Sequence, residues 1–284
     1  MRIVLSLLML SMLFLSTAVG ADLAALEAKG LKVRKAKDGT VTEAYVGPKA
    51  TLAPAEYKVI GEFRDTLITL NLSANEPRLS GEILAAIGPM PKVERFFSNG
   101  ARLLDDDFCH FAAWTSLKKF GLDHWGWFEP PHKQKVGPGV AQLAALPHLE
   151  ELRLGGCRVE DPAIEAVAKI EGLKSLDIFH LGYTDNGVAA LRSLKRLVKL
   201  RINGPRLTNK SLEHVAGLES LETLTVSEMT VTYPGGLEHL KKLRNLKEIE
   251  LEKVTTSDED VAKLKADHTA AEVTWTKPEP PKSR

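Results

Sequence analysis

The chain has few of the features that mark an enzyme or a disulfide-bonded scaffold. It contains only two cysteines in 284 residues, too few for the set of bridges that holds small exported domains together. No nucleophile-elbow, zinc-protease, phosphate-loop, dinucleotide-binding or haem-attachment motif occurs in it. The sequence therefore predicts no catalytic residues, and neither a metal ion nor another cofactor is expected.

An excess of charge of either sign is also missing. The 38 basic and 37 acidic residues give a formal net charge of +1, which falls to zero if Arg2 is lost with an N-terminal leader. A nucleic-acid-binding chain normally carries a basic excess or a basic stripe. No nucleic-acid partner is therefore expected.

Long apolar runs are absent except at the N-terminus. Met1 and Arg2 precede a mostly apolar stretch over residues 3–15, and small residues follow it. This order is typical of a secretory signal peptide, and the stretch is shorter than the roughly 20 residues of a membrane span. We expect residues 1–21 to be removed and the mature chain to be secreted or periplasmic, without a membrane-embedded part. A membrane anchor is the alternative.

What the sequence does have is a repeated unit. Residues 149–154 read apolar-x-x-apolar-x-apolar, and the same template returns three more times at intervals of 24 residues. Over the whole chain, copies begin at Val41, Leu67, Val93, Leu117, Leu149, Leu173, Leu197, Leu221, Leu246 and, in degraded form, Ala270. Apolar residues also stand nine, six and three places before most of these starts, a spacing that indicates a short helix. Regular self-similarity at this period is typical of a solenoid.

The turn between the strand and the helix repeats as well. Aspartate or asparagine stands twelve places after several repeat starts, at Asp105, Asp161, Asp185, Asn209 and Asp258. A side-chain oxygen at this place is expected to cap the N-terminus of its own helix. Thr184, Thr208 and Ser257 precede three of these residues.

The pattern resembles the leucine-rich repeat family, and most closely its short, 24-residue, ribonuclease-inhibitor-like or cysteine-containing type found in exported bacterial proteins. The resemblance covers about residues 41–275. It implies an α/β solenoid (horseshoe) of about nine to ten repeats, with short parallel strands on the concave side and short helices on the convex side. In this family the ninth repeat position carries Asn or Cys; Asn75 and Cys157 match it, whereas most repeats here carry an apolar residue instead.

The remaining segments give the expected domain organisation. Residues 22–40 are predicted to form an N-terminal cap, a helix plus the first strand of a hairpin that turns at Asp38 and Gly39. The repeats occupy residues 41–276, with an insertion near 124–137. Residues 277–284 are rich in proline and charge and are expected to be disordered.

The polar cluster from Asp105 to His110 is the strongest candidate for chemistry. Asp105 stands in the capping column, and acidic residues suit the first turn of a helix, so a structural role is the favoured interpretation. Cys109 lies on a predicted helix and Cys157 just after a strand two repeats later, too far apart for a bridge. We expect both cysteines to be reduced and mostly buried.

The outward side chains of the strands are the better candidates for binding. Fifth-position residues should form one row across the sheet, in which Arg153, Asp177 and Arg201 are neighbours about 5 Å apart and form an ion-pair ladder. Tyr45 and Phe97 in the same row, and Phe179 two places further along its strand, are aromatic residues suited to anchoring a partner.

The insertion supplies Trp125, Trp127 and Phe128. These aromatic side chains either fold back to seal the solenoid or form part of a binding surface, as loops on a rigid scaffold often do.

The sequence thus predicts an exported leucine-rich-repeat protein that binds another protein or a cell-surface ligand through its concave face and the aromatic insertion. It is not expected to be an enzyme. The alternatives are a hydrolase that uses the His/Asp cluster near residues 105–132, and a structural envelope component without a specific ligand.

Overall fold

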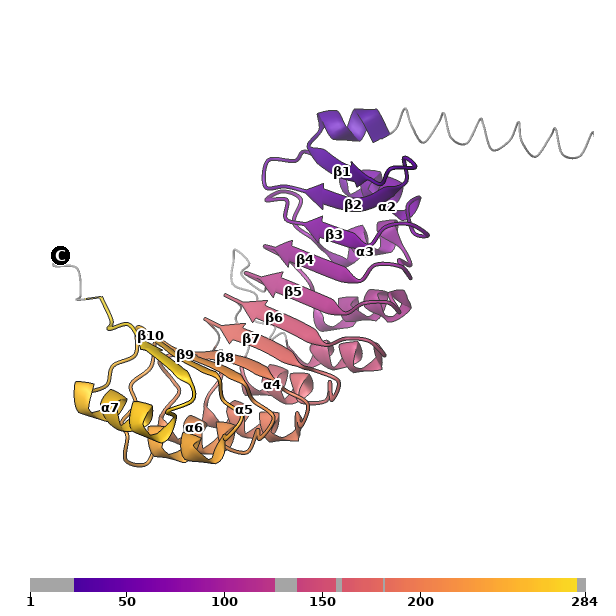
Figure 1. The fold of residues 1–284 in the computed structure, drawn as a ribbon. Coiled ribbons are helices and arrows are strands. Elements are labelled where there is room, and N and C mark those ends of the chain that lie inside the picture. The colour runs from indigo at the N-terminus through magenta and orange to yellow at the C-terminus, as the bar shows by residue number, and fades with distance from the viewer. Residues whose placement is uncertain (1–22, 126–136, 157–159, 181, 280–284) are drawn as a thin grey trace, which may run out of the picture.

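The computed structural model describes residues 23–125, 137–156, 160–180 and 182–279. Within these ranges eleven strands form one sheet, and their order in the sheet is their order in the sequence. The first two strands pair antiparallel, and each later pair is parallel. Figure 1 shows the strands along the inner side of an arc and the helices along its outer side. The α/β horseshoe predicted from the repeats is therefore confirmed.

The strands are short, mostly five residues long. They are β1 (Leu31–Lys35), β2 (Val41–Val46), β3 (Thr69–Leu72), β4 (Arg95–Asn99), β5 (Lys119–Asp123), β6 (Glu151–Gly155), β7 (Ser175–Phe179), β8 (Lys199–Asn203), β9 (Thr223–Ser227), β10 (Glu248–Glu252) and β11 (Glu272–Trp275).

The helices alternate with the strands and are either α-helices or 3-10 helices, the latter labelled η. Residues 23–28 are helical. The labelled helices are η1 (Pro54–Tyr57), α2 (Lys58–Gly61), α3 (Gly81–Ile87), η2 (Asp105–Ala113), η3 (Pro138–Ala145), α4 (Asp161–Val167), α5 (Asp185–Ala190), η4 (Leu191–Ser193), α6 (Asn209–Val215), η5 (Leu237–Lys242) and α7 (Asp258–Asp267). In the described ranges none of them combines the length and the apolar composition needed to span a membrane.

The pairing of the strands follows the repeat alignment. The third residue of each repeat lies opposite the third residue of the next, from Glu43 with Thr69 to Glu248 with Glu272. β11 is thus the strand of the degraded copy that begins at Ala270. Because side chains alternate along a strand, the fourth residues turn toward the helices and are buried, among them Leu70, Phe96, Phe120, Leu152, Leu176 and Leu200.

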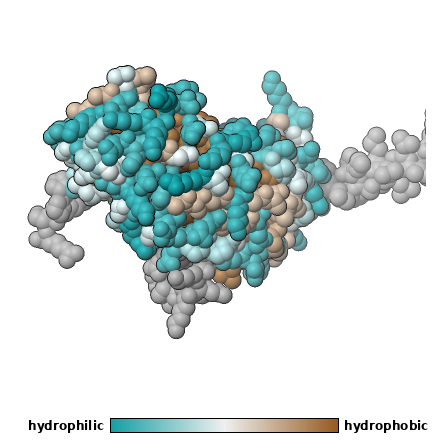
Figure 2. All heavy atoms as spheres, turned by 90° about the horizontal axis from the view of Figure 1, so that it is seen from below, coloured by the Kyte–Doolittle hydropathy of each residue, from teal (hydrophilic) through white to brown (hydrophobic). Residues whose placement is uncertain are grey.

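The helices close the core from the convex side. Phe108, Phe111 and Trp114 of one repeat are at most 1% exposed, and they are three residues apart, as the apolar spacing predicted. A 3-10 helix has three residues per turn and places such residues on one side. The helices η2, η3 and η5 take this form, whereas α4 and α6 are α-helices with the same apolar spacing. The surface in Figure 2 is mostly hydrophilic, because the apolar columns lie inside.

The aspartates of the turn have a different role from the one predicted. The residue before them caps the helix: the hydroxyl oxygens of Thr184, Thr208 and Ser257 accept hydrogen bonds from backbone N–H groups of their own first turns. The carboxylate of Asp185 instead accepts from the next repeat, from the backbone N–H of Thr208 at 3.0 Å and from its hydroxyl at 2.7 Å. Asp161 accepts the same two bonds from Thr184. The amide oxygen of Asn209 accepts from the backbone N–H of Thr232, and its amide nitrogen donates to the Thr232 hydroxyl. The expectation that these residues cap their own helices was wrong, and they link consecutive repeats instead.

Replacing Asp185 by Ala is expected to lower the free energy of unfolding by about 2–3 kcal/mol. The buried hydroxyl of Ser211 also donates to Asp185, and a buried group that loses a charged partner costs about this much. Burial alone would raise the pKa of Asp185, but the bonds from Ser211 and Thr208 outweigh it and lower the pKa, in line with a bound carboxylate. Urea unfolding followed by circular dichroism measures the loss.

The matched control for this prediction is Asp185→Asn. Asparagine already makes the equivalent bonds at Asn209, so this variant should keep more than half of the lost stability. Equal losses in the two variants would contradict the linking role and would point to a requirement for negative charge alone.

Candidate functional site

The outward fifth-position residues form the continuous row that the repeat alignment predicted. Phe97 on β4 lies opposite Gly121 on β5, which lies opposite Arg153 on β6. The row continues through Asp177 on β7 and Arg201 on β8, and in the other direction it reaches Tyr45 on β2 by way of Asn71 on β3. The sheet thus brings six of the predicted binding residues onto its concave face: Tyr45, Phe97, Arg153, Asp177, Arg201 and, from the seventh position, Phe179.

A hollow of about 370 Å³ lies on this face over β3 to β7, and we call it the central hollow. Its side walls include Phe97, Arg153 and Asp177, together with the third-position residues Arg95 and Lys119. A Cβ atom on Gly121 would lie 2.8 Å from Cδ2 of Phe97, so the absence of a side chain there lets the phenyl ring lie against β5. The ring of Phe97 therefore occupies the place that a side chain at position 121 would take.

Arg153 is the centre of a charged network beside the hollow. Its guanidinium group lies 3.0 Å from Asp123 and 2.5 Å from Asp177. Arg201 lies 4.0 Å from Asp177 and 2.5 Å from Glu252. The predicted ladder of Arg153, Asp177 and Arg201 is therefore present, and it is longer than predicted because Asp123 and Glu252 extend it.

The protonation behaviour of the network follows from its partial burial. Burial raises the pKa of the Asp177 carboxyl, and the charges of Arg153 and Arg201 oppose that rise. Burial on its own would lower the pKa of Arg153, but the hydrogen bond and charge of Asp123, together with Asp177, raise it. Arg153 is thus fully charged and committed to two carboxylates, so it stabilises one wall of the hollow.

The ring of Phe179 packs against the arginines of this network, whereas the sequence predicted a separate contact for a partner. The guanidinium carbon of Arg153 is 4.4 Å from the centre of its ring, and that of Arg201 is 5.8 Å away. A Cβ atom on Gly155 would lie 2.0 Å from Cζ of Phe179, so here too a glycine in the same column makes room for a ring. Phe179 chiefly supports the two arginines through cation–π contacts.

Tyr45 lies away from the central hollow. Its side chain is 37% exposed, and it borders a separate hollow of about 360 Å³ with Lys32, Arg34 and Thr69. The two predicted aromatic anchors therefore belong to different hollows of the face, and Phe97 is the one in the central hollow.

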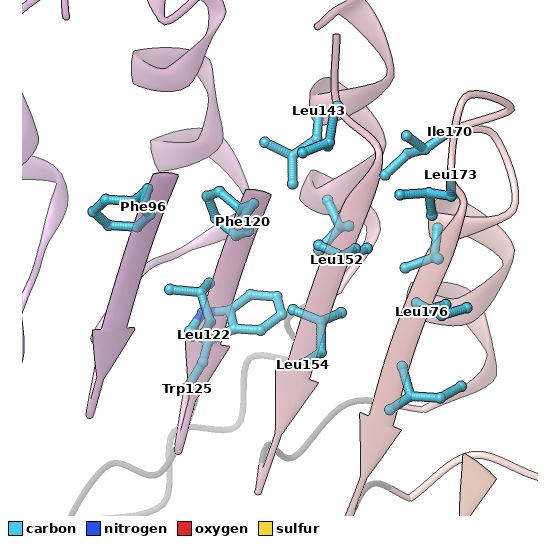
Figure 3. Packing of buried hydrophobic residues seen from close by; sticks show 14 of the residues in the cluster. Phe96, Phe120, Leu122, Trp125, Leu143, Leu152, Leu154, Ile170, Leu173 and Leu176 are labelled. Atoms are coloured by element: carbon cyan, nitrogen blue, oxygen red, sulfur yellow. The ribbon is translucent and has the colours of Figure 1, made fainter. Parts of the chain in front are cut away.

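Trp125 is part of the core and does not belong to a binding surface. It is 0% exposed, its Nε1–H donates to the carbonyl oxygen of Leu103 at 2.7 Å, and its ring meets that of Phe108 at 5.2 Å. Figure 3 shows it in the layer of Leu122 and Leu154, with its ring turned into the row of core side chains. Including Trp125 among the binding residues was therefore wrong, and it folds back as the alternative proposed. Trp127 and Phe128 lie outside the described residues.

In the His/Asp cluster, two carboxylates accept hydrogen bonds from backbone N–H groups. The carboxylate of Asp105 accepts from the N–H groups of Gly137 at 2.8 Å and Gly139 at 3.0 Å, and that of Asp107 accepts from the N–H of Leu104 at 2.8 Å. Across the described ranges, no three His, Cys, Asp or Glu side chains lie close enough together to hold a metal ion. The described part of the cluster therefore gives the hydrolase alternative no support.

The thiol of Cys109 is free and exposed. The expectation that it is buried was wrong, because its neighbours Phe108 and Phe111 take the inward positions of η2. Cys157 lies outside the described residues, so the expectation for it stays a prediction.

Arg95 was not singled out from the sequence. Its Nε donates to the hydroxyl of Thr69 at 3.0 Å, and it borders the hollow beside Phe97. The available signal was its place in the sequence, two residues before the outward aromatic on the same strand.

Comparison with known proteins concerns the fold. No family model matches the sequence, and no curated protein matches it. Among solved structures, an internalin from Listeria monocytogenes is similar at 18% identity and a TM-score of 0.56, over 78% of this chain and 64% of that one. Internalin C2 of the same organism gives 19% and 0.52, over 80% and 86%.

A third similar structure is the leucine-rich-repeat ectodomain of the Arabidopsis receptor kinase HAESA in complex with a peptide hormone, at 15% identity and a TM-score of 0.51, over 79% of this chain and 36% of that one. This chain thus spans about two thirds or less of two of the three proteins. At identities this low the similarity establishes a shared fold. It does not transfer the binding partners of those proteins to this chain. The chain therefore has the leucine-rich-repeat fold. The register of β2 to β11, the helices on the convex side and the similarity to these structures all indicate it.

Proposed function

We propose that this chain is an exported binding module that holds a protein partner on the concave face of its sheet. The observation that carries the proposal is the central hollow, where the ring of Phe97 is partly exposed beside charged side chains. An apolar group rimmed by polar ones is typical of an interaction site, and aromatic residues often supply most of the binding energy. The ion pairs of Arg153 hold one wall in place before any partner arrives, which reduces the entropy lost on binding.

Three further points of the proposal rest on the sequence. Residues 1–21 act as a signal peptide, so the partner is met outside the cytoplasm, and residues 22–40 cap the first repeat. The 24-residue spacing supports assignment of the repeats to the short, ribonuclease-inhibitor-like or cysteine-containing type. That one similar structure holds a peptide hormone supports a partner of protein or peptide nature.

Site-specific photo-crosslinking tests the proposal. A photoreactive residue placed at Ser175, which borders the hollow, is expected to give a covalent adduct with one partner in cells that produce the protein. The same residue at Glu165, exposed on helix α4 of the convex side, should give none. Both changes replace side chains outside the core, so the melting temperature should stay the same. An adduct from Glu165 alone, or from neither position, would contradict binding on the concave face and would favour a structural envelope component.

A further inference from the structure

The charged residues of the central hollow are unequally paired. Lys119 lies 2.7 Å from Glu151, and Arg153 is bound to Asp177. Within the described ranges, Arg95 is the cation of this hollow that forms no ion pair with a carboxylate of the chain. The lining therefore contains three cations and two carboxylates, and its surplus positive charge belongs to Arg95.

Arg95 is held in place although no carboxylate of the described residues forms an ion pair with it. Its Nε donates to the hydroxyl of Thr69 on the neighbouring strand at 3.0 Å, which restricts the side chain. The two terminal nitrogens of a guanidinium group form a planar fork that matches a carboxylate. An arginine that is both oriented and without a counter-charge is suited to receive an acidic group from a ligand.

The phenyl ring of Phe97 stands next to this cation. Arg95 and Phe97 are two residues apart on β4 and therefore point to the same side of the sheet, about 7 Å apart. Because Gly121 has no side chain, the ring lies against β5 and stays partly exposed to the hollow. One apolar contact and one acidic contact can thus be made by neighbouring groups of a single ligand.

The length of the hollow sets the size of the ligand. Its lining runs from Thr69 on β3 to Asp177 on β7, and four strand spacings of about 4.8 Å make about 19 Å. An extended peptide advances about 3.3 Å per residue, so about six residues cover this length.

The acidic end of the face limits where such a peptide can lie. The three outward residues of β10 are Glu248, Glu250 and Glu252, of which only Glu252 forms an ion pair in the described ranges, with Arg201. An acidic segment is repelled there and favoured at β4. A single surplus cation is also too little for a nucleic acid, which needs several phosphate contacts.

We infer that the central hollow binds an extended acidic peptide segment of about six residues, with an apolar side chain on Phe97 and a carboxylate on Arg95. The inference rests on the proposed binding function of the concave face and names the chemistry of its ligand. A partner protein would present such a segment as a loop or a terminus.

Selection from a random hexapeptide library displayed on phage, against the immobilised full-length chain, tests the inference. Sequences enriched on the wild type should combine Asp or Glu with a large apolar residue. Selection on Arg95→Glu should enrich Lys or Arg in place of the acidic residues, and selection on Phe97→Ala should lose the apolar preference. Because the peptide loses a charge-assisted contact and its carboxylate meets a like charge, a synthetic peptide of the enriched sequence should bind Arg95→Glu at least ten-fold more weakly than the wild type.

Lys199→Ala is the matched control. Lys199 is an exposed third-position cation on β8, outside the hollow, so this variant should select the wild-type sequences. The inference is overturned if the wild type enriches no acidic peptide, or if Arg95→Glu and Lys199→Ala select alike. Crosslinking at Ser175 is independent of these results: an adduct there without acidic selection rejects the peptide chemistry and leaves the proposed function standing, whereas loss of both rejects the binding face itself.

Discussion

Replacing Trp125 by Ala is expected to lower the free energy of unfolding by about 3–5 kcal/mol. The indole is 0% exposed, and it fills the end of the core beside Phe108, where the ring centres are 5.2 Å apart. Its removal leaves a cavity and also leaves the carbonyl oxygen of Leu103 without its 2.7 Å hydrogen bond. Urea unfolding followed by far-ultraviolet circular dichroism gives the loss directly.

Trp125→Phe separates the two contributions. This variant keeps an aromatic ring in the core and removes the indole N–H, so it should lose about 1–3 kcal/mol, the cost of one unsatisfied buried acceptor. If Trp125→Ala instead unfolds like the wild type but no longer forms the adduct at Ser175, then Trp125 contacts the partner and the assignment to the core is wrong.

The repeat architecture could be predicted because every repeat buries the same set of apolar positions. An apolar column at the fourth position must face the helices, and this requirement fixes the register of every parallel strand, as the alignment of Arg95 with Lys119 and of Glu151 with Ser175 confirms. The same regularity predicted that Arg153, Asp177 and Arg201 would be neighbours. Local periodicity determines these features, so no long-range information was needed.

Contacts between non-equivalent side chains of neighbouring repeats were not predicted. That Asp185 reaches Thr208 in the next repeat, while Thr184 caps the helix, depends on the small distance between adjacent turns, which a linear pattern does not give. The position of the Phe97 ring was missed for the same reason, since the ring lies in the space that Gly121 leaves on the following strand. A search for glycine directly after an aromatic residue in one column would have found it.

The eighth position shows how a repeat departs from its own rule. The chain there adopts positive φ values, and Gly100, Gly156 and Gly204 meet this requirement without strain. His124 and His180 stand in the same column at φ 53°, a conformation that is unfavourable for residues other than glycine. Their rings bind other repeats. Nδ1 of His124 lies 2.7 Å from the amide oxygen of Asn99 in the preceding repeat, and Nε2 of His180 lies 3.3 Å from Glu228, two repeats further along. The repeat pattern alone gives neither histidine a partner, because both partners belong to other repeats.

An aromatic cluster lies in the core behind the central hollow, and a substitution in it is expected to cause the second large loss of stability. Phe111 lies at its centre, with ring centres 5.2 Å from Phe96, 5.1 Å from Trp114 and 4.9 Å from Phe120. Phe96 belongs to β4 and Phe120 to β5, so the ring of Phe111 joins two consecutive repeats. In a solenoid the stability of the whole depends on such nearest-neighbour interfaces.

Phe111→Ala is therefore expected to remove about 3–5 kcal/mol at one interface and to split the unfolding of the chain into two steps. The strands β1 to β4 should then unfold separately from β5 to β11, because each part keeps its own internal interfaces. Hydrogen exchange measured by mass spectrometry at intermediate urea should show exchange of residues 23–99 and protection of the later repeats, or the reverse order.

The matched control is Phe179→Ala. It removes the same ring from the outward face, where the main contact of the ring is the cation–π contact with Arg153. This variant should lose about 1 kcal/mol and unfold in a single transition. If Phe111→Ala loses the predicted stability but still unfolds in a single transition, the two-step prediction is wrong. The interface between β4 and β5 would then be no more critical than the others. The backbone hydrogen bonds between strands and the Asp–Thr links along the whole arc would make unfolding cooperative.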